Sequence, residues 1–311
     1  MKLIRKLKNG IKYLTDPDYR FMINAEAGCY GDMPDELYLK RLYRSLTGRE
    51  LDLENPRRIN EKIQWLKLYD RRPEYVMMSD KYLVREFIGN RIGERYLIPS
   101  LGVWDQPEEI DFDSLPDRFV LKCNHNSGKG MCICRDKSRL DWEKTVRDLR
   151  EGLREDYFRK GREWCYRDIP RKIVGEQLLV NGADPDLPDY KVICCDGEPK
   201  YVEIHRTRFI AHTLDCYDLS GKRMDVSHYY NTSGLELAEL PEFWQEMLDL
   251  SRVLAEGIPQ VRVDWYFADG QLYFGEMTFY LGSGFDEFVP DEFNEVFGDW
   301  VKLPEPWLEG S

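Results

Sequence analysis

The sequence predicts an α+β fold in which antiparallel hairpins alternate with helices. Between residues 34 and 95, apolar side chains recur at helical spacing. After Asp117 the apolar runs become short and rich in β-branched and aromatic residues, which is typical of strands. Two of these runs flank Asp196-Gly197, a dipeptide that favours a tight hairpin turn. At 311 residues, the chain has the length of two domains or of one large domain.

The N-terminal part is expected to be helical. One helix covers residues 35–45, a second begins near Asn60, which is a plausible helix cap, and a third covers residues 80–90. We therefore assign residues 1–75 to an N-terminal helical region and residues 76–311 to a second domain. Within that domain, a boundary between two subdomains is expected near residues 175–180.

The second part is expected to contain the strands. Residues 119–122 and 131–134 are predicted strands joined by a polar loop, and a charged helix follows at about residues 139–160. The remaining predicted elements are strands at 173–180, 190–195 and 200–204, a helix at 241–256, and a last pair of strands within 261–279.

The charge balance argues against a nucleic-acid partner. The chain has 45 Lys and Arg against 57 Asp and Glu, a net charge of −12, whereas binding of nucleic acid requires a basic surface. A local basic pocket for a small anion is compatible with this balance. The eight cysteines include no C-x-x-C pair, so we expect buried reduced thiols in place of a zinc or redox site.

The sequence is expected to belong to a cytoplasmic protein. No apolar run approaches the roughly 18–20 residues of a membrane span, and no signal peptide is recognisable. The N-terminal segment is basic, with Lys2, Arg5, Lys6, Lys8 and Lys12. A solvated helix is the favoured interpretation of this segment, and peripheral contact with the inner face of the membrane is the alternative.

The most informative segment is residues 261–279, which form two strand-like runs around a turn. We expect a three-residue loop at 268–270, with Gly270 in the left-handed position. The register that follows pairs Asp264 with Phe274 and Arg262 with Glu276.

This register places two carboxylates on one face of the hairpin. Asp264 and Glu276 are diagonal neighbours there, and paired carboxylates repel each other unless a cation or proton lies between them. Two carboxylates suit Mg²⁺ with substrate phosphates, and Arg262 would stabilise charge on a phosphoryl group. A two-residue turn would put the carboxylates on opposite faces. The alternative interpretation is a solvated face with an Arg–Glu pair.

A second signal is the polar loop at residues 124–130, between two predicted strands. Its glycines let backbone N–H groups approach phosphate oxygens, and Lys122 and Lys129 could supply positive charge. The loop does not have the Walker A pattern. An ordinary flexible hairpin is an equally good interpretation from these residues alone.

These features follow one another in a specific order along the chain. A strand lysine with a glycine-rich loop comes first, then a Glu-led apolar segment, then the two hairpins. In this order the sequence resembles the TupA-like branch of the ATP-grasp superfamily, over about residues 52–303. The motifs that carry the resemblance are I-N-E-K-I-Q-W-L-K-L-Y-D from Ile59, S-D-K-Y-L-V-R-E-F from Ser79, F-V-L-K-C-N-H from Phe119, G-R-E-W from Gly161, D-Y-K-V-I-C-C-D-G-E-P-K from Asp189, V-R-V-D-W-Y from Val261 and Y-F-G-E-M-T-F-Y-L-G-S-G-F from Tyr273.

The resemblance implies an ATP-grasp fold, with two α+β subdomains that clasp ATP and a helical region before them. Mg²⁺ would be held by Asp264 and Glu276, with Thr278 as a neutral oxygen ligand where many relatives outside this branch have Asn. Arg262 would contact the transferring phosphoryl group and, with Lys122, is the expected catalytic pair. The implied ATP contacts are Lys122, Ser127, Gly128, Lys129, Gly130, Glu176, Gln177, Leu178 and Lys191.

The resemblance also implies an ADP-forming carboxylate–amine ligase that acts through an acyl phosphate. It would join an amine or amino acid to a sugar-acid carboxylate, on a small molecule or glycan precursor, during assembly of a capsular or other surface polysaccharide. Weaker substrate contacts are expected at Arg206 and Arg208, and at the backbone of Gly282, Ser283 and Gly284. For the two arginines, a solvated basic turn is an equally good interpretation.

Two other activities stay open at this stage. A glycosyltransferase would need a D-x-D pair on its metal, and the three D-x-D tripeptides, which begin at residues 16, 111 and 184, all lie in predicted loops. An ATP-grasp kinase that phosphorylates a sugar hydroxyl would use the same ATP site, so only the product would separate it from a ligase.

Overall fold

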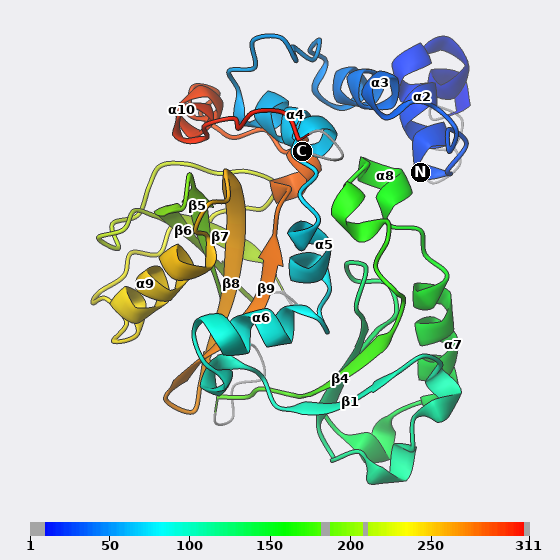
Figure 1. Ribbon diagram of the computed structural model, residues 1–311, viewed down its shortest axis with the longest axis vertical. Coiled ribbons are helices and arrows are strands. Elements are labelled where there is room, and N and C mark those ends of the chain that lie inside the picture. Colours follow the sequence, from blue (N-terminus) through cyan, green and yellow to red (C-terminus); the bar gives the residue numbers. More distant parts are fainter. Residues whose placement is uncertain (1–9, 182–186, 208–210, 308–311) are drawn as a thin grey trace.

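Two antiparallel sheets form the framework of the molecule (Figure 1). The computed structural model describes residues 10–181, 187–207 and 211–307. Within these ranges the strand order is β1-β4-β2-β3 in one sheet and β7-β6-β5-β8-β9 in the other. Helices and antiparallel hairpins together confirm the predicted α+β class. The described helices include none that is both long and apolar enough to cross a membrane.

The described N-terminal residues form helices, including those predicted at 35–45, near residue 60 and within 80–90. Its helices are α2 (Pro17–Glu26), α3 (Asp35–Thr47), α4 (Ile59–Tyr69), α5 (Glu74–Ser79) and α6 (Val84–Arg91). The helices α2 and α3 share a small core around Phe21, Tyr38 and Leu42. In contrast, Ile59, Ile63 and other residues of α4 join the large core that contains the second sheet. The basic residues Lys2, Arg5, Lys6 and Lys8 lie outside the described residues.

Asn60 is not a helix cap, so this prediction was wrong. The helix α4 begins one residue earlier, and the Glu61 carboxylate accepts the backbone N–H of Arg58, 3.0 Å away. Asn60 is buried in the first turn, and its amide donates to the carbonyl of Asp286 at 2.5 Å. Its polar side chain therefore connects the helix to a distant segment, which a local sequence pattern cannot reveal.

The first sheet contains the glycine-rich loop between β2 and β3. Its strands are β1 (Ser100–Trp104), β2 (Phe119–Cys123), β3 (Met131–Cys134) and β4 (Ile173–Gln177). The charged helix predicted at 139–160 is divided into α7 (Trp142–Leu153) and the short α8 (Phe158–Gly161). The chain turns between them, and this turn brings Glu155 beneath the glycine-rich loop, where it accepts a hydrogen bond from Asn126.

The second sheet has helix α9 on one face and the charged residues on the other. Its strands are β5 (Asp189–Cys195), β6 (Glu198–Arg206), β7 (Thr213–Tyr217), β8 (Gln260–Ala268) and β9 (Gln271–Thr278), and the helices that follow β7 and β9 are α9 (Trp244–Leu254) and α10 (Phe293–Trp300). Trp265 faces α9, and its indole N–H donates to the hydroxyl of Ser251 at 2.9 Å. Because side chains alternate along a strand, Asp264 lies on the opposite face.

The turn between β8 and β9 differs from the prediction. Ala268 pairs with Gln271 around a two-residue turn, so the predicted three-residue loop was wrong. Asp269 and Gly270 have φ values of +51° and +77°, the positive values that a tight type I′ hairpin needs. The Asp196-Gly197 turn between β5 and β6 has the same two-residue form, as predicted.

A β-bulge then restores the shared face of the two carboxylates. The observed pairs are Arg262 with Thr278, Val263 with Met277 and Trp265 with Phe274. Asp264 therefore lies opposite two residues, Gly275 and Glu276. The predicted pairs of Asp264 with Phe274 and of Arg262 with Glu276 were wrong. Asp264 and Glu276 still share a face, because the extra residue compensates for the shorter turn.

Candidate functional site

A cavity of about 540 Å³ lies between the two sheets. Lys122 and the loop after β2 line one side, and Lys191, Arg262, Asp264 and Glu276 line the other. Its volume is within the range of roughly 300–1,000 Å³ that is usual for ligand pockets. The fold thus gathers lysines and carboxylates from distant parts of the chain around one space.

A row of charged side chains crosses the second sheet. Glu203 on β6 is the cross-strand partner of Lys191 on β5, and Lys191 is in turn the partner of Asp264 on β8. Cross-strand partners share one face of a sheet, so the three side chains lie side by side at the cavity. The Lys191 ammonium forms an ion pair with Oδ2 of Asp264 and lies 3.6 Å from Oδ2 of Asp189.

Arg262 joins the two carboxylates. Its Nε lies 2.6 Å from Oδ1 of Asp264, and its Nη2 lies 2.8 Å from Oδ2 of Asp264 and 3.0 Å from Oε1 of Glu276. Burial would raise the pKa of Glu276, but the surrounding Lys and Arg side chains lower it to about 2. Glu276 is therefore ionised at neutral pH, as a carboxylate that ligates a metal must be.

Lys81 is a cation of this cavity that sequence reasoning missed. It follows α5, and its ammonium donates to the carbonyl of Asn126 at 2.7 Å, at the base of the glycine-rich loop. Burial lowers the pKa of Lys81, and the charge of Glu276 opposes this shift. Lys81 lies in the S-D-K-Y motif, but nothing in the local pattern indicates that its side chain reaches a cavity formed by two sheets.

The glycine-rich loop is held firmly at its base. The Asn126 amide donates to Oε2 of Glu155 at 2.9 Å, and Nε2 of His125 lies 3.1 Å from the Glu155 carbonyl oxygen. Gly130 has a φ of +68°, and a Cβ there would come within 2.8 Å of the Cα of Gly152. Gly130 therefore packs against α7. The cavity is lined by its neighbours Ser127, Gly128 and Lys129.

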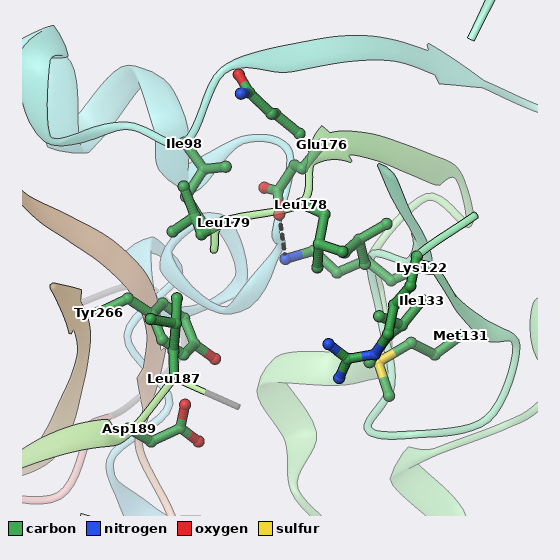
Figure 2. A pocket seen from close by; sticks show the side chains of 13 residues that line it. Ile98, Lys122, Met131, Ile133, Glu176, Leu178, Leu179, Leu187, Asp189 and Tyr266 are labelled. Carbon is green, nitrogen blue, oxygen red and sulfur yellow. Dashed lines mark ion pairs between the residues drawn. The ribbon is translucent and has the colours of Figure 1, made fainter. Parts of the chain in front are cut away.

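A smaller, mostly apolar pocket of about 200 Å³ adjoins the cavity. The two spaces share Lys122, Met131 and Tyr266 as lining residues. Figure 2 shows Tyr266 and Leu187 on one side of the pocket and Ile133 and Met131 on the other. The predicted residues Gln177 and Leu178 also line it. Sequence reasoning missed the remaining apolar wall, which includes Ile98, Val120, Ile133, Leu179, Leu187 and Tyr266.

Glu176 lines the apolar pocket and pairs with Lys122, which lines both the pocket and the cavity. Its Oε2 lies 2.5 Å from the Lys122 ammonium, the ion pair drawn in Figure 2, and its Oε1 lies 3.6 Å from the guanidinium of Arg85. The family resemblance implied that Glu176 contacts ATP. In the structure it neutralises two cations at the point where the apolar lining gives way to the charged one.

Histidines form a further wall of the cavity. Nε2 of His228 and of His205 lie 3.0 and 3.3 Å from the Glu203 carboxylate, and Nδ1 of His205 lies 2.9 Å from Nε2 of His212. Burial would lower the pKa of His228, but Glu203 and Asp286 raise it to about 9, so this imidazole is charged at neutral pH. Burial lowers the pKa of His205, which is therefore neutral. From the sequence, His205 was considered as a substrate contact but a structural role was favoured, and no role was given to His212 or His228.

The turn after β9 is held from below by helix α4. The Lys67 ammonium donates to the carbonyl oxygens of Gly161 and Ser283, each at 2.7 Å, and lies 3.0 Å from Oγ of Ser283. The Ser283 side chain therefore points toward α4, whereas Gly282 lines the cavity. A Cβ on Gly284 would come within 2.5 Å of the amide nitrogen of Gln64, so this glycine packs on α4 as well.

Two other predicted residues, Thr278 and Arg206, are not among the described residues that line the cavity. Thr278 is the ladder partner of Arg262 but is not among the described lining residues. Arg206 forms an ion pair with Asp215 at 3.1 Å at the edge of the sheet. Arg208 lies outside the described residues. The site roles given to these residues by the sequence stay predictions.

Asp264 and Glu276 are the carboxylates of the cavity that could hold Mg²⁺. The described residues contain no group of three or more His, Cys, Asp or Glu arranged to hold a metal ion. Mg²⁺ that binds with a nucleotide needs only one or two carboxylates, because phosphates and water supply its other oxygens. Asp264 and Glu276, which share one face and one arginine, fit this requirement.

Comparison of the sequence with known protein families agrees with this arrangement of lysines and carboxylates around the cavity. Residues 61–302 match the family described as TupA-like ATPgrasp. The chain belongs to the TupA-like ATP-grasp family. This family assignment confirms the resemblance seen in the sequence motifs, and it covers both sheets and the cavity between them. Comparison with curated proteins gives no match.

Solved structures similar to this TupA-like chain include ligases and a synthase of low sequence identity. The D-alanine–D-alanine ligase from Helicobacter pylori is 13% identical with a TM-score of 0.48, over 78% of this chain and 69% of that one. The corresponding Bacillus anthracis ligase, complexed with ATP, is 16% identical with a TM-score of 0.38, over 65% and 53%. N5-carboxyaminoimidazole synthase from Aspergillus clavatus, with ADP and 5-aminoimidazole ribonucleotide, is 10% identical with a TM-score of 0.38, over 65% and 44%. This chain thus spans about half the length of the last two proteins.

Proposed function

We propose that the protein is an ATP- and Mg²⁺-dependent carboxylate–amine ligase that forms ADP. The observation that carries this proposal is the continuity between an apolar pocket and a cavity that contains lysines and paired carboxylates. A nucleobase needs the first environment, and a triphosphate with its metal needs the second. Lys122 lines both spaces, at the point where the α- and β-phosphates of ATP would lie.

The chain offers positive charge to the phosphates from several sides. Lys81, Lys122 and Lys191 come from three separate segments and line the same cavity. The glycine-rich loop adds Lys129 and its backbone N–H groups. Phosphoryl transfer depends mainly on positioning and on neutralising charge, so such a set of cations is what the reaction requires of the protein.

Asp264 and Glu276 would hold Mg²⁺, which when bound would neutralise charge on the phosphates. Arg262 contacts both carboxylates, so its guanidinium would lie beside the phosphoryl group that is transferred. A substrate carboxylate oxygen would form a bond to the γ-phosphorus while the bond to ADP breaks. An amine would then attack the carbonyl carbon of the acyl phosphate, and phosphate would leave as the amine loses its proton. No side-chain nucleophile is needed.

The carboxylate substrate that we propose is a sugar acid, and the amine is an amino acid or another amine. The wall beyond the carboxylates supports this choice, because it combines rings with hydrogen-bonding groups. The Tyr230 ring lies against the His212 ring, with centroids 3.7 Å apart and planes tilted by 34°, and Asp286 and His205 line the same cavity. Such a reaction would serve surface-polysaccharide assembly in the cytoplasm, at or near the inner face of the membrane.

The first experiment is thermal stabilisation by ATP, ADP and nucleotide sugars, each with and without Mg²⁺. A ligand at 100 times its dissociation constant adds about 2.7 kcal/mol, which is a readable shift. We expect Mg²⁺-dependent stabilisation by ATP and ADP that is lost in Asp264→Asn. Asp249→Asn is the matched control, because Asp249 is an exposed carboxylate on α9 whose partners are Gln245 and Arg252.

The outcome also separates the alternatives. Stabilisation by a nucleotide sugar and not by ATP would contradict the ligase proposal and favour glycosyl transfer. If ATP binds, hexuronic acids are screened with amines for release of phosphate. A stable sugar phosphate without an amide would show a kinase.

A further inference from the structure

Both oxygens of the Asp264 carboxylate already have cationic partners. Oδ1 accepts from Nε of Arg262 at 2.6 Å, and Oδ2 accepts from Nη2 of the same arginine at 2.8 Å. Oδ2 also forms an ion pair with the Lys191 ammonium. Asp264 and Lys191 are both buried, so water competes little for these contacts.

We propose that Lys191 makes the binding of Mg²⁺ depend on the binding of the nucleotide. While Lys191 holds Asp264, a divalent cation must displace an ammonium to reach this carboxylate. This inference rests on the proposed function, since it assumes that the same cavity binds a nucleotide and a metal. It concerns how this chain's own residues couple the two.

Nucleotide and metal binding are coupled because the cations that hold Asp264 can pair with phosphate oxygens instead. Phosphate oxygens that enter the cavity offer Lys191 and Arg262 new anionic partners, so both can release Asp264. The released carboxylate then has a lone pair directed at the cavity, which suits a divalent cation. By linkage, whatever factor the nucleotide adds to metal affinity, the metal adds to nucleotide affinity.

Lys122 is the appropriate comparison within the same cavity. It also lines the space where phosphates would lie, but its ion pair is with Glu176 on the first sheet, at 2.5 Å. Removal of the Lys122 charge should lower the affinity for the nucleotide but should not free a carboxylate to bind the metal. Loss of either lysine's charge should therefore lower nucleotide affinity, but only loss of the Lys191 charge should change metal affinity.

The test measures Mn²⁺ binding by electron paramagnetic resonance, with and without ADP, in the full chain. Mn²⁺ serves as the probe because carboxylate, water and phosphate oxygens suit it as they suit Mg²⁺. In the unsubstituted protein we expect ADP to raise Mn²⁺ affinity by about tenfold or more, a usual size for coupling between two sites. In Lys191→Met we expect Mn²⁺ alone to bind about tenfold more tightly, and ADP to bind more weakly. In Lys122→Met only the ADP affinity should fall.

Each outcome decides the question. Equal Mn²⁺ affinity with and without ADP in the unsubstituted protein would overturn the proposal, whether or not the variant folds. Unchanged or weaker binding of Mn²⁺ alone in a folded Lys191→Met would overturn it as well. If ADP does not bind to any form, the proposed function fails, and the comparison of Mn²⁺ alone in the two proteins still tests the contact between Lys191 and Asp264.

Discussion

The ammonium of Lys122 lies 2.5 Å from Oε2 of Glu176, at the junction of the apolar pocket and the charged cavity. The Glu176 side chain is 8% exposed, and it also lies 3.6 Å from Arg85. One carboxylate thus compensates two cations in a region that is largely shielded from water. Loss of its charge leaves both cations without this partner.

Glu176→Gln should therefore lower the free energy of unfolding by up to about 3 kcal/mol, because breaking a buried ion pair leaves uncompensated charge. Urea denaturation without nucleotide measures this change. The control is Glu36→Gln, since the Glu36 and Lys40 side chains are 49% and 45% exposed and an exposed pair contributes less than about 1 kcal/mol. Equal losses in the two variants would contradict the importance of burial.

The apolar pocket gives a prediction about nucleotide affinity that does not involve charge. Ile133 faces Tyr266 and Leu187 across a space of about 200 Å³, so Ile133→Trp should fill the pocket and reduce ADP affinity at least tenfold. Titration calorimetry with ADP measures the effect. Ile133→Val keeps the pocket open and should change the affinity little. If the Trp variant binds ADP normally, the nucleobase does not lie there.

Gly130 and Gly128 allow a comparison of crowding with backbone strain. Both have positive φ, +68° and +83°, but only at Gly130 would a Cβ meet other atoms, the Cα of Gly152 and Sγ of Cys123, both at 2.8 Å. We expect Gly128→Ala to cost roughly 1 kcal/mol from backbone strain alone, and Gly130→Ala to cost clearly more. Thermal melts of the two variants test this order, and the reverse order would contradict the packing of the loop against α7.

His228 predicts a loss of stability in alkaline solution. Its folded pKa is about 9 against an ordinary value of 6.5, so its contribution is complete below pH 6.5 and is lost as the pH rises through 9. The difference of 2.5 pH units corresponds to about 3 kcal/mol at most. Urea denaturation between pH 6 and 9.5 should show this decline. In His228→Gln the decline should be smaller by the same amount, and identical pH profiles would contradict the raised pKa.

The sequence predicted the carboxylates of the site better than the hairpin that holds them. Asp264 and Glu276 share a face as expected, but the expected loop length was wrong. The Asp269-Gly270 turn has the same form as Asp196-Gly197, which was predicted correctly. A β-bulge depends on how two strands pair with their neighbours, and Gly275 alone does not specify one.

The residues that sequence reasoning missed come from segments that meet only in the folded chain. Lys81 follows α5, and its approach to the loop depends on how α5 packs against α6 and β9. The histidine wall had one usable signal. Glu203 and His205 are two residues apart on β6, so their side chains share one face of the strand and indicate that this face is polar. The predicted strand ended at residue 204 and therefore left His205 out.

The Lys67 ammonium, which holds the carbonyls of Gly161 and Ser283, determines how far the protein can be dissected. Helix α4 is early in the sequence, yet its Lys67 side chain supports the turn that follows β9, the last strand. Ile59 and Ile63 are in the same core as the second sheet. A chain shortened to begin after Tyr69 would lose the Lys67 contacts to this turn and the part of the core that Ile59 and Ile63 form. Helix α4 therefore cannot be exchanged as an independent module without also rebuilding the turn that follows β9.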